Sequence, residues 1–132
     1  MAPKWSKLNL CNMATQRKPI THTIDASGKV LGRLASEIAP LLMGKKNADF
    51  TPNIDTKDVV EVKNAARMIL TGNKLEQKEY YHHSMYPNGL KTLQLKTLWK
   101  KDPADALRRS VSRMLPKNRM RDLRLKRLII TN

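Results

Sequence analysis

The sequence predicts an α/β domain in which helices pack on a small sheet, and three observations lead to this class. Short β-branched segments alternate with longer segments whose apolar residues recur at helical spacing. Their order is strand, helix, strand, and then strand, helix, helix, strand, which favours a parallel or mixed sheet. The chain has 132 residues, 40% of them apolar, which is enough for one domain with a modest core.

The first half of the chain begins with a strand at Ile20–Ile24, which is β-branched and partly alternating. A turn at Asp25–Gly28 leads to an amphipathic helix over about residues 29–43, where apolar side chains return every three or four positions. Pro40 lies inside the last turn, so we expect it to kink or shorten the helix by removing a backbone hydrogen bond. Gly44 is placed to end this helix.

The middle of the chain carries two further strands. Asp58–Val62 predicts the second strand, and Asn64–Leu70 is either a short helix or a turn. Lys78–His83 predicts the third strand, and Tyr86–Gly89 is expected to be a turn. After it, the segment 90–99 has apolar residues at helical spacing.

The last helix begins at Asp102, an N-cap side chain followed by proline at the first helical position. Its apolar stripe faces the domain, which turns Arg109 and Arg113 to the opposite side of the helix. Pro116 ends the helix. Leu125–Ile130 is then expected to form a closing strand.

The charge of the chain points to a polyanionic partner. The formal net charge is +15, and residues 67–132 hold 16 of the Lys and Arg against 5 acids. A charge on this scale bears on partners rather than on fold, and it favours nucleic acid first and an anionic membrane surface second. A membrane binder needs an apolar face opposite its charges, whereas the apolar stripes of this chain are expected to be used in the core.

Residues 1–19 are expected to form a flexible basic arm. The first 24 residues contain no acid, as in a transit peptide, but they are poor in arginine and serine. Cys11 is the only cysteine, which excludes an intrachain disulfide and a cysteine-based zinc cluster. No apolar run approaches the length of a membrane span.

No arrangement of residues predicts an active site. His82 and His83 are adjacent in a strand and point to opposite faces, so they cannot easily bind one metal together. Asp55 and Asp58 have a spacing that would suit magnesium in a nuclease, but a loop-capping role is favoured. Ser84 lies beside His83 without the third group that a nucleophile needs. We therefore expect no catalysis and no cofactor.

Tyr80 and Tyr81 lie among lysines and histidines, a combination that favours RNA. Because neighbouring strand residues face opposite ways, we expect one tyrosine to pack in the core and the other to contact a partner. A free nucleic-acid-binding protein, such as a regulator, is an alternative, although the chain lacks a recognisable recognition helix at helix-turn-helix spacing.

Four blocks of sequence resemble the bacterial-type large-subunit ribosomal protein thirteen family in their order and spacing. The resemblance covers about residues 20–130. The blocks are "IDASGKVLGRLASEIAPLLMGK" (Ile24–Lys45), "VKNAARMILTGNK" (Val62–Lys74), "KEYYHHS" (Lys78–Ser84) and "RRSVSRMLPKNR" (Arg108–Arg119).

This resemblance implies a three-layer α/β/α domain over residues 20–132, in which helices flank a small, mainly parallel sheet and basic extensions project from the ends. It implies a structural constituent of the large ribosomal subunit that binds large-subunit ribosomal RNA, supports subunit assembly and hence translation, and has no enzymatic activity. The implied partners are that RNA and neighbouring ribosomal proteins, with no membrane, small-molecule substrate or homo-oligomer. The implied location is the cytoplasmic ribosome of a bacterium rather than an organellar ribosome.

The resemblance and the charge pattern together assign RNA contacts to a set of polar residues. A basic limb, the arginine run at 113–124, is expected to enter an RNA groove and to be loose without it. The assigned residues are Arg33, Lys45, Lys46, Lys74, Tyr81, His82, His83, Lys91, Arg109, Arg113, Lys117, Asn118, Arg119, Arg121 and Arg124.

Three departures from the family pattern affect turns. The family usually has glycine where this chain has Lys57 and Arg121, and it has more glycine in the stretch Met85–Asn88. Since a side chain resists a positive φ, each departure predicts a reshaped turn.

Overall fold

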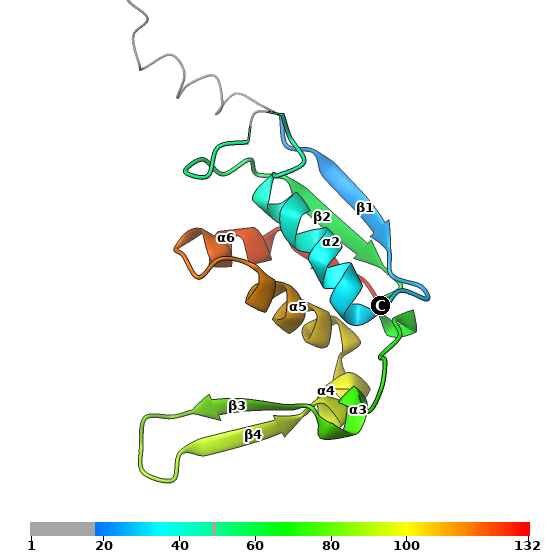
Figure 1. Ribbon diagram of the computed structural model, residues 1–132, viewed down its shortest axis with the longest axis vertical. Coiled ribbons are helices and arrows are strands. Elements are labelled where there is room, and N and C mark those ends of the chain that lie inside the picture. Colours follow the sequence, from blue (N-terminus) through cyan, green and yellow to red (C-terminus); the bar gives the residue numbers. More distant parts are fainter. Residues whose placement is uncertain (1–17, 49) are drawn as a thin grey trace, which may run out of the picture.

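The computed structural model describes residues 18–48 and 50–132 and shows two lobes (Figure 1). The sheet lobe comprises the described residues up to 69 together with 102–132, and the hairpin lobe comprises residues 70–101. Residues 1–17, which include Cys11 and most of the arm expected over residues 1–19, lie outside the described part of the chain.

The sheet lobe is built on three parallel strands in the order β1 (Thr21–Asp25), β2 (Val59–Lys63) and β5 (Leu128–Ile130). Alternate residues of each strand point to the helices, so Val60 and Val62 in the central strand are completely buried. The strands at 20–24 and 58–62 were thus predicted to within one residue, and the α/β class with a small, mainly parallel sheet is confirmed.

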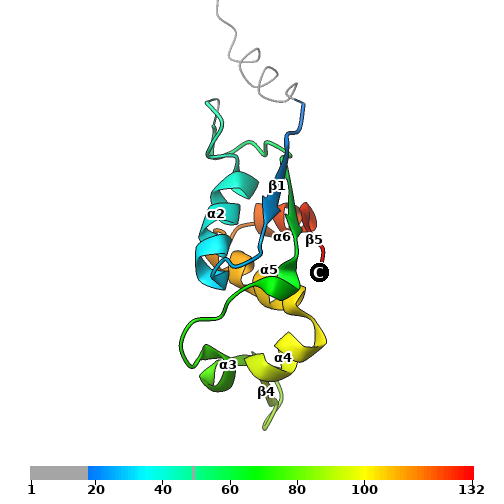
Figure 2. The same ribbon diagram turned by 90° about the vertical axis from the view of Figure 1, so that its right-hand side faces the viewer.

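Helix α2 (Leu31–Met43) connects β1 to β2 and lies along one face of the sheet (Figure 2). Helix α5 (Pro103–Met114) packs against α2, and the apolar residues between these elements form the main core. Helix α6 (Met120–Lys126) lies next to β5 and leads into it. The largest completely buried apolar side chains of this core are Leu34, Ile38, Leu42, Val60, Val62, Leu107 and Val111.

The helices cover one face of the sheet, which differs from the expected three layers. The chain crosses the sheet in one direction, from β1 to β2 to β5, and right-handed crossovers then place successive helices on the same face. On the other face Thr21, Thr23 and Lys63 are exposed, and Ile129 keeps 48% of its surface accessible. Among the described residues, the arrangement is therefore one helical layer on one sheet.

The hairpin lobe projects from the sheet lobe as two antiparallel strands (Figure 1). Strands β3 (Glu79–His83) and β4 (Leu90–Gln94) are framed by two short helices, α3 (Lys74–Gln77) and α4 (Leu95–Lys101). A second, smaller core at the base of the hairpin contains Tyr80, Leu95, Leu98 and Ala106. Leu70 and Trp99 pack against both cores and so join the lobes.

Several local predictions are confirmed and others are wrong. Asp102 caps α5 by accepting a hydrogen bond from the Ala104 N–H at 2.9 Å, as its position predicted. Pro40 does not shorten α2, which continues to Met43 and ends at Gly44 with φ 75°. Residues 90–94 form a strand because they pair with β3, although their apolar spacing suggested the start of a helix.

The end of the chain is also more helical than predicted. Residues 120–126 form helix α6, and the closing strand is limited to residues 128–130. A short helical turn at Ala65–Arg67 follows β2, where a short helix or turn was expected.

Three residues in the turns expected to be reshaped have a left-handed backbone. Lys57, Met85 and Asn88 have φ of 59°, 65° and 60°, values that favour glycine. These three residues therefore adopt the strained conformation themselves. Arg121 differs, because it lies within helix α6 and needs no positive φ.

Candidate nucleic-acid interface

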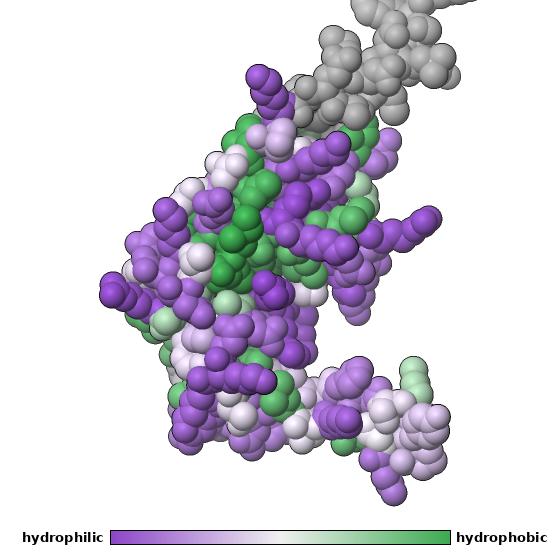
Figure 3. Space-filling model, turned by 180° about the vertical axis from the view of Figure 1, so that it is seen from behind, coloured by the Kyte–Doolittle hydropathy of each residue, from purple (hydrophilic) through white to green (hydrophobic). Residues whose placement is uncertain are grey.

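A basic groove separates the β3–β4 hairpin from helix α5, and Figure 3 shows it as a hollow between the projecting hairpin and the rest of the molecule. We call it the hairpin groove. One wall comes from the two strands of the hairpin, and the other comes from α5 with one residue of α6. The lining residues are Tyr80, Tyr81, His82, Lys91, Thr92, Leu93, Asp105, Arg108, Arg109, Ser112, Arg113 and Leu125.

The alternation of strand β3 separates the two tyrosines. Tyr80 points inward and retains 5% of its surface accessible, whereas Tyr81 points outward and retains 64%. The Tyr81 hydroxyl donates to Glu79 Oε2 at 2.8 Å, which fixes the ring without covering it. The predicted division between a packed and an outward-facing tyrosine is confirmed.

The buried Tyr80 ring supports the cations of the groove. The guanidinium groups of Arg109 and Arg113 lie 5.4 and 5.1 Å from the ring centroid, and Lys78 Nζ lies at 5.7 Å. Burial raises the pKa of Tyr80, so the phenol is neutral at physiological pH. A neutral ring attracts cations through its π face, with about 0.5–2 kcal/mol for each contact. The ring therefore holds two arginines at the groove before any partner arrives.

Arg109 and Arg113 differ in whether an acidic side chain neutralises their charge. Arg109 Nε donates to Asp105 Oδ2 at 2.9 Å, an ion pair one turn apart on α5. Arg113 makes the Tyr80 contact and no ion pair with any described residue. Because no acid neutralises it, Arg113 is the stronger candidate for a phosphate contact.

The hairpin places His82 and Lys91 in the groove, whereas His83 does not line it. His82 lies directly opposite Lys91 in the antiparallel register, and both line the groove. His83 follows on the other side of the strand, where its Nδ1 accepts the Met85 N–H at 3.0 Å. The described residues contain no group of three or more His, Cys, Asp or Glu side chains that could hold a metal ion.

Other predicted residues lie around the groove. Lys117, Asn118 and Arg119 are exposed in the connection between α5 and α6, on the same side of the molecule as the hairpin turn (Figure 1). Lys74 is exposed at the start of α3, where its Nζ donates to Thr71 Oγ1 at 3.2 Å. Arg121 is only partly exposed and lies 3.9 Å from Asp122.

Three further predicted residues also do not line the groove. Lys45 and Lys46 are exposed in the turn after α2, at the opposite end of the molecule from the hairpin (Figure 1). Arg33 is exposed on α2 itself. The structure therefore does not gather all the predicted residues into one patch.

Arg124 corrects the expectation of a free basic limb. Its side chain is 3% exposed and its Nε lies 3.7 Å from Asp55 Oδ1. Arg127 also binds Asp55 through both terminal nitrogens, one of them at 2.7 Å from Oδ1. The run therefore ends in a helix attached to the core, because a buried guanidinium is retained where a carboxylate neutralises it.

The surroundings of the Asp55 carboxylate favour its ionised form. Burial alone would raise the pKa of Asp55, but the hydrogen bond from Arg127 and the charges of Arg127 and Arg124 outweigh it and hold the pKa below its ordinary value. Asp55 thus forms ion pairs with two arginines. Sequence inspection missed this role, since Arg127 is 72 positions away from Asp55.

The Asp58 carboxylate likewise has partners within the protein. Its side chain is completely buried, and it accepts the Ile20 N–H at 3.1 Å and the Asn47 side-chain amide at 2.7 Å. It therefore joins the start of β1 to the loop after α2. Asp58 thus joins two loops, close to the loop-capping role that was favoured, whereas Asp55 pairs with Arg124 and Arg127 instead.

The described part of the chain has no helix with the length and apolarity needed to span a membrane. A small α/β domain presents arginines and an exposed tyrosine in a groove, which defines the class of basic proteins whose surface is shaped to contact a polyanion.

Residues 20–131 match the Ribosomal protein L13 family, and the chain belongs to this family. It is 53% identical over 107 residues to large ribosomal subunit protein uL13 of Thermotoga petrophila, covering 81% of this chain and 72% of that protein. It is 58% identical over 99 residues to the protein of the same name from Chloroflexus aggregans, covering 75% and 69% of the two chains. The corresponding Geobacter sulfurreducens protein is 50% identical over 107 residues, covering 81% and 75%.

Proposed function

We propose that this chain is a structural constituent of the large ribosomal subunit and binds large-subunit ribosomal RNA through the hairpin groove. The observation that carries the proposal is the pair of arginines, Arg109 and Arg113, held over the buried Tyr80 ring beside the exposed Tyr81. The similarity to proteins named large ribosomal subunit protein uL13 supports the assignment to that subunit.

Binding is expected to combine phosphate contacts with base stacking. Lys and Arg release counterions from the RNA backbone, so affinity should fall steeply as salt rises. Arginine suits this role because its planar fork pairs with phosphate oxygens, and holding it in place beforehand reduces the entropy lost on binding. The exposed face of Tyr81 offers a surface on which an unpaired base can stack.

The remaining predicted residues extend the contact beyond the groove. The connection after α5 is proposed to bind RNA that continues past the end of this helix, through Lys117, Asn118 and Arg119. The hairpin contacts the same RNA through Lys91, His82 and His83. Arg33, Lys45 and Lys46 would meet RNA on other sides of the domain, as expected for a protein surrounded by a folded RNA, and Lys74 would meet it at the start of α3. Arg121 contributes at the edge of α6, and Arg124 is left out because it is buried.

The proposed mechanism is binding, without catalysis or a cofactor. By fixing several RNA segments against one rigid domain, the protein would favour one RNA shape and so support assembly of the subunit and translation. Neighbouring large-subunit proteins are the further partners that this location implies. The bacterial relatives place the proposed site of action on the cytoplasmic ribosome of a bacterium.

Cosedimentation tests this proposal most simply. Native protein from a cell lysate is followed through a sucrose gradient at low and at high salt. We expect stoichiometric recovery with the large subunit that survives the salt wash. Protein that sediments free of the ribosome, or that leaves it at modest salt, would contradict the structural role.

A further inference from the structure

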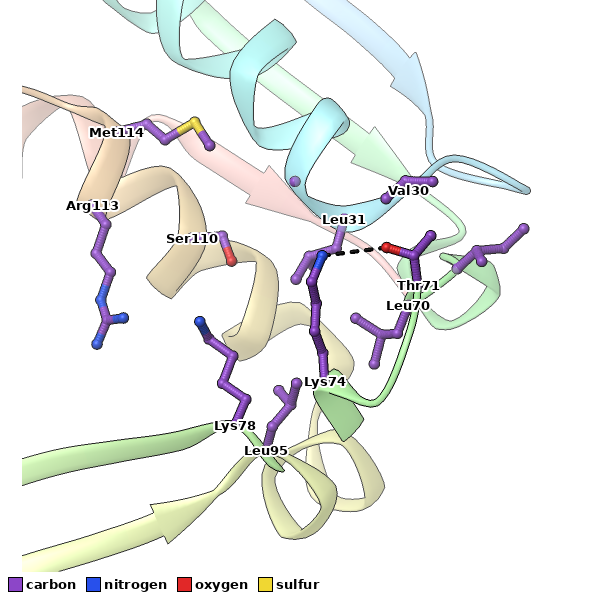
Figure 4. Close-up of a pocket in the computed structure, with 12 residues that line it drawn as sticks. Val30, Leu31, Leu70, Thr71, Lys74, Lys78, Leu95, Ser110, Arg113 and Met114 are labelled. Carbon is purple, nitrogen blue, oxygen red and sulfur yellow. Dashed lines mark hydrogen bonds between the residues drawn. The ribbon is translucent and has the colours of Figure 1, made fainter. Parts of the chain in front are cut away.

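An apolar pocket lies where the two lobes meet, and Figure 4 shows its walls. Its volume is about 370 Å³, within the range of pockets that hold small organic groups. The beginning of α2, the link into α3, the first residues of β3 and α4, and one side of α5 supply the lining. These residues are Val30, Leu31, Gly32, Ile69, Leu70, Thr71, Lys74, Lys78, Leu95, Ser110, Arg113 and Met114.

The interlobe pocket, as we call it, combines apolar walls with positively charged side chains. Large apolar side chains form the walls, and two of them, Ile69 and Met114, leave 48% and 46% of their surface in solvent. Lys74 and Lys78 extend from the hairpin lobe toward the sheet lobe, and Arg113 hangs from α5 (Figure 4). No acid is among the lining residues. The pocket thus offers apolar contact together with unopposed positive charge.

We propose that the interlobe pocket receives one unpaired nucleotide extruded from the ribosomal RNA. The base would lie between the aliphatic walls, and its phosphate would meet the cations. A nucleotide combines the two properties that the pocket complements, an apolar face and a negative charge, on a scale that suits about 370 Å³. This inference rests on the proposed function and adds to it a class of RNA element, an extruded base.

The position of Arg113 connects this pocket to the hairpin groove. Arg113 lines both cavities, so RNA held in the groove has its backbone next to the entrance of the pocket. Lys78 is shared in a similar way, because it lines the pocket and also lies 5.7 Å from the Tyr80 ring at the groove. A nucleotide could therefore enter without the rest of the RNA leaving the groove.

Gly32 provides a substitution that fills the pocket without removing a charge. It lies in the first turn of α2, and a Cβ atom added there would meet no atom within 4 Å. Since glycine is a poor helix former, Gly32→Leu should not weaken the helix. Thr97→Leu is the matched control, because it adds an exposed leucine to helix α4 away from the pocket.

The experiment measures binding of the full chain to transcribed large-subunit ribosomal RNA over a series of salt concentrations. We expect Gly32→Leu to weaken binding about tenfold, with the salt dependence unchanged because no cation is lost. Thr97→Leu should bind like the original chain. Base-specific chemical probing should show one or two positions that are protected by the original chain and reactive with Gly32→Leu.

Wild-type affinity and unchanged base protection in Gly32→Leu would overturn the inference. It would also be overturned if Gly32→Leu bound naked RNA normally but failed to enter the subunit, since the pocket would then receive a protein. Thermal unfolding confirms that each variant is folded, and Ser110→Leu, on the opposite wall, replaces Gly32→Leu if that variant is unstable. Failure of the original chain to bind this RNA would instead contradict the proposed function.

Discussion

The sheet lobe and the hairpin lobe differ in how many of their residues are buried. In the sheet lobe, α2 alone contributes seven buried residues to the core. In the hairpin, Tyr80 is the only buried residue of the two strands, and beyond it Met85 and Tyr86 are 90% and 76% exposed. A two-stranded hairpin is marginally stable by itself, so this one depends on the contact of its base with α4 and α5.

This difference indicates a division of roles between the lobes. The sheet lobe supplies the free energy of folding, while the hairpin exposes side chains that gain burial only from a partner. The two are connected through Tyr80, which belongs to the small core and also supports the groove arginines. Substitutions in the core of the sheet lobe should therefore change stability, and substitutions in the hairpin groove should change RNA affinity.

The largest expected effect on stability comes from removing Asp55 in the sheet lobe. Asp55→Ala leaves Arg124, which is 3% exposed, without its carboxylate, and an uncompensated buried charge costs about 3 kcal/mol. Urea unfolding measures the loss. The matched control is Glu37→Gln, which breaks the exposed ion pair with Lys29 and should cost less than about 1 kcal/mol. Equal effects of the two variants would contradict the role of Asp55 as the carboxylate that neutralises the buried Arg124.

Acid should weaken the sheet lobe through the same carboxylate and through Asp25. The Ser27 N–H, the Asn64 amide and the Ser27 hydroxyl all donate to Asp25 and lower its pKa to about 2. Because both folded pKa values lie below the value of about 3.9 in an unfolded chain, the stabilisation is complete above about pH 5 and is lost as pH falls toward the folded values. The urea midpoint should decrease from pH 5 to pH 2.

A comparison with Asp25→Asn identifies the source of this acid response. The variant lacks one of the two titrating groups, so its midpoint should fall less steeply between pH 5 and pH 2. An identical slope in both proteins would show that Asp25 does not contribute.

A smaller effect, of opposite sign, is expected in the loop before β2. Lys57 has φ of 59°, a conformation that costs a side-chain residue about 1–2 kcal/mol and glycine little. After the greater entropy loss of glycine is subtracted, Lys57→Gly should stabilise the protein by about 0.5–1 kcal/mol in urea unfolding. Lys57→Ala keeps the strain, so stabilisation by alanine as well would show that the lysine charge is the cause.

The smallest effect on stability is expected at Tyr81 in the hairpin. Its ring is 64% exposed, so Tyr81→Ala should change the unfolding free energy by less than about 0.5 kcal/mol. The same variant should weaken binding to large-subunit ribosomal RNA by about tenfold or more if a base stacks on the ring. Tyr81→Phe keeps the ring and should bind normally, and a loss in Tyr81→Phe would point to the hydroxyl instead.

The two lobes also differ in how well the sequence predicted them. Local patterns predicted β1, α2, β2 and the capped start of α5 because apolar spacing and the Asp-Pro cap act within one element. The strand at 90–94 was missed, since its pairing with β3 overrides its helical spacing. The covered face of the sheet depends on strand order, which no local pattern contains.

The candidate site was predicted in part for similar reasons. Charge and strand alternation identified Tyr81, Arg109 and Arg113, and these residues do meet in one groove. The same charge pattern included Arg124, because composition does not distinguish an arginine that faces solvent from one paired to a distant carboxylate. The support of the arginines by the Tyr80 ring is a tertiary contact that became visible only in the structure.

The most direct test of the central claim compares two pairs of neutralised cations in binding to transcribed large-subunit ribosomal RNA. One variant carries Arg109→Gln and Arg113→Gln in the groove, and the other carries Lys63→Gln and Lys126→Gln, exposed residues that do not line the groove. We predict weaker binding and a salt dependence reduced by about two units in the groove variant, one for each lost phosphate contact, with little change in the other. Equal losses in both variants would mean that the RNA responds to total charge, and would contradict a binding groove between the hairpin and α5.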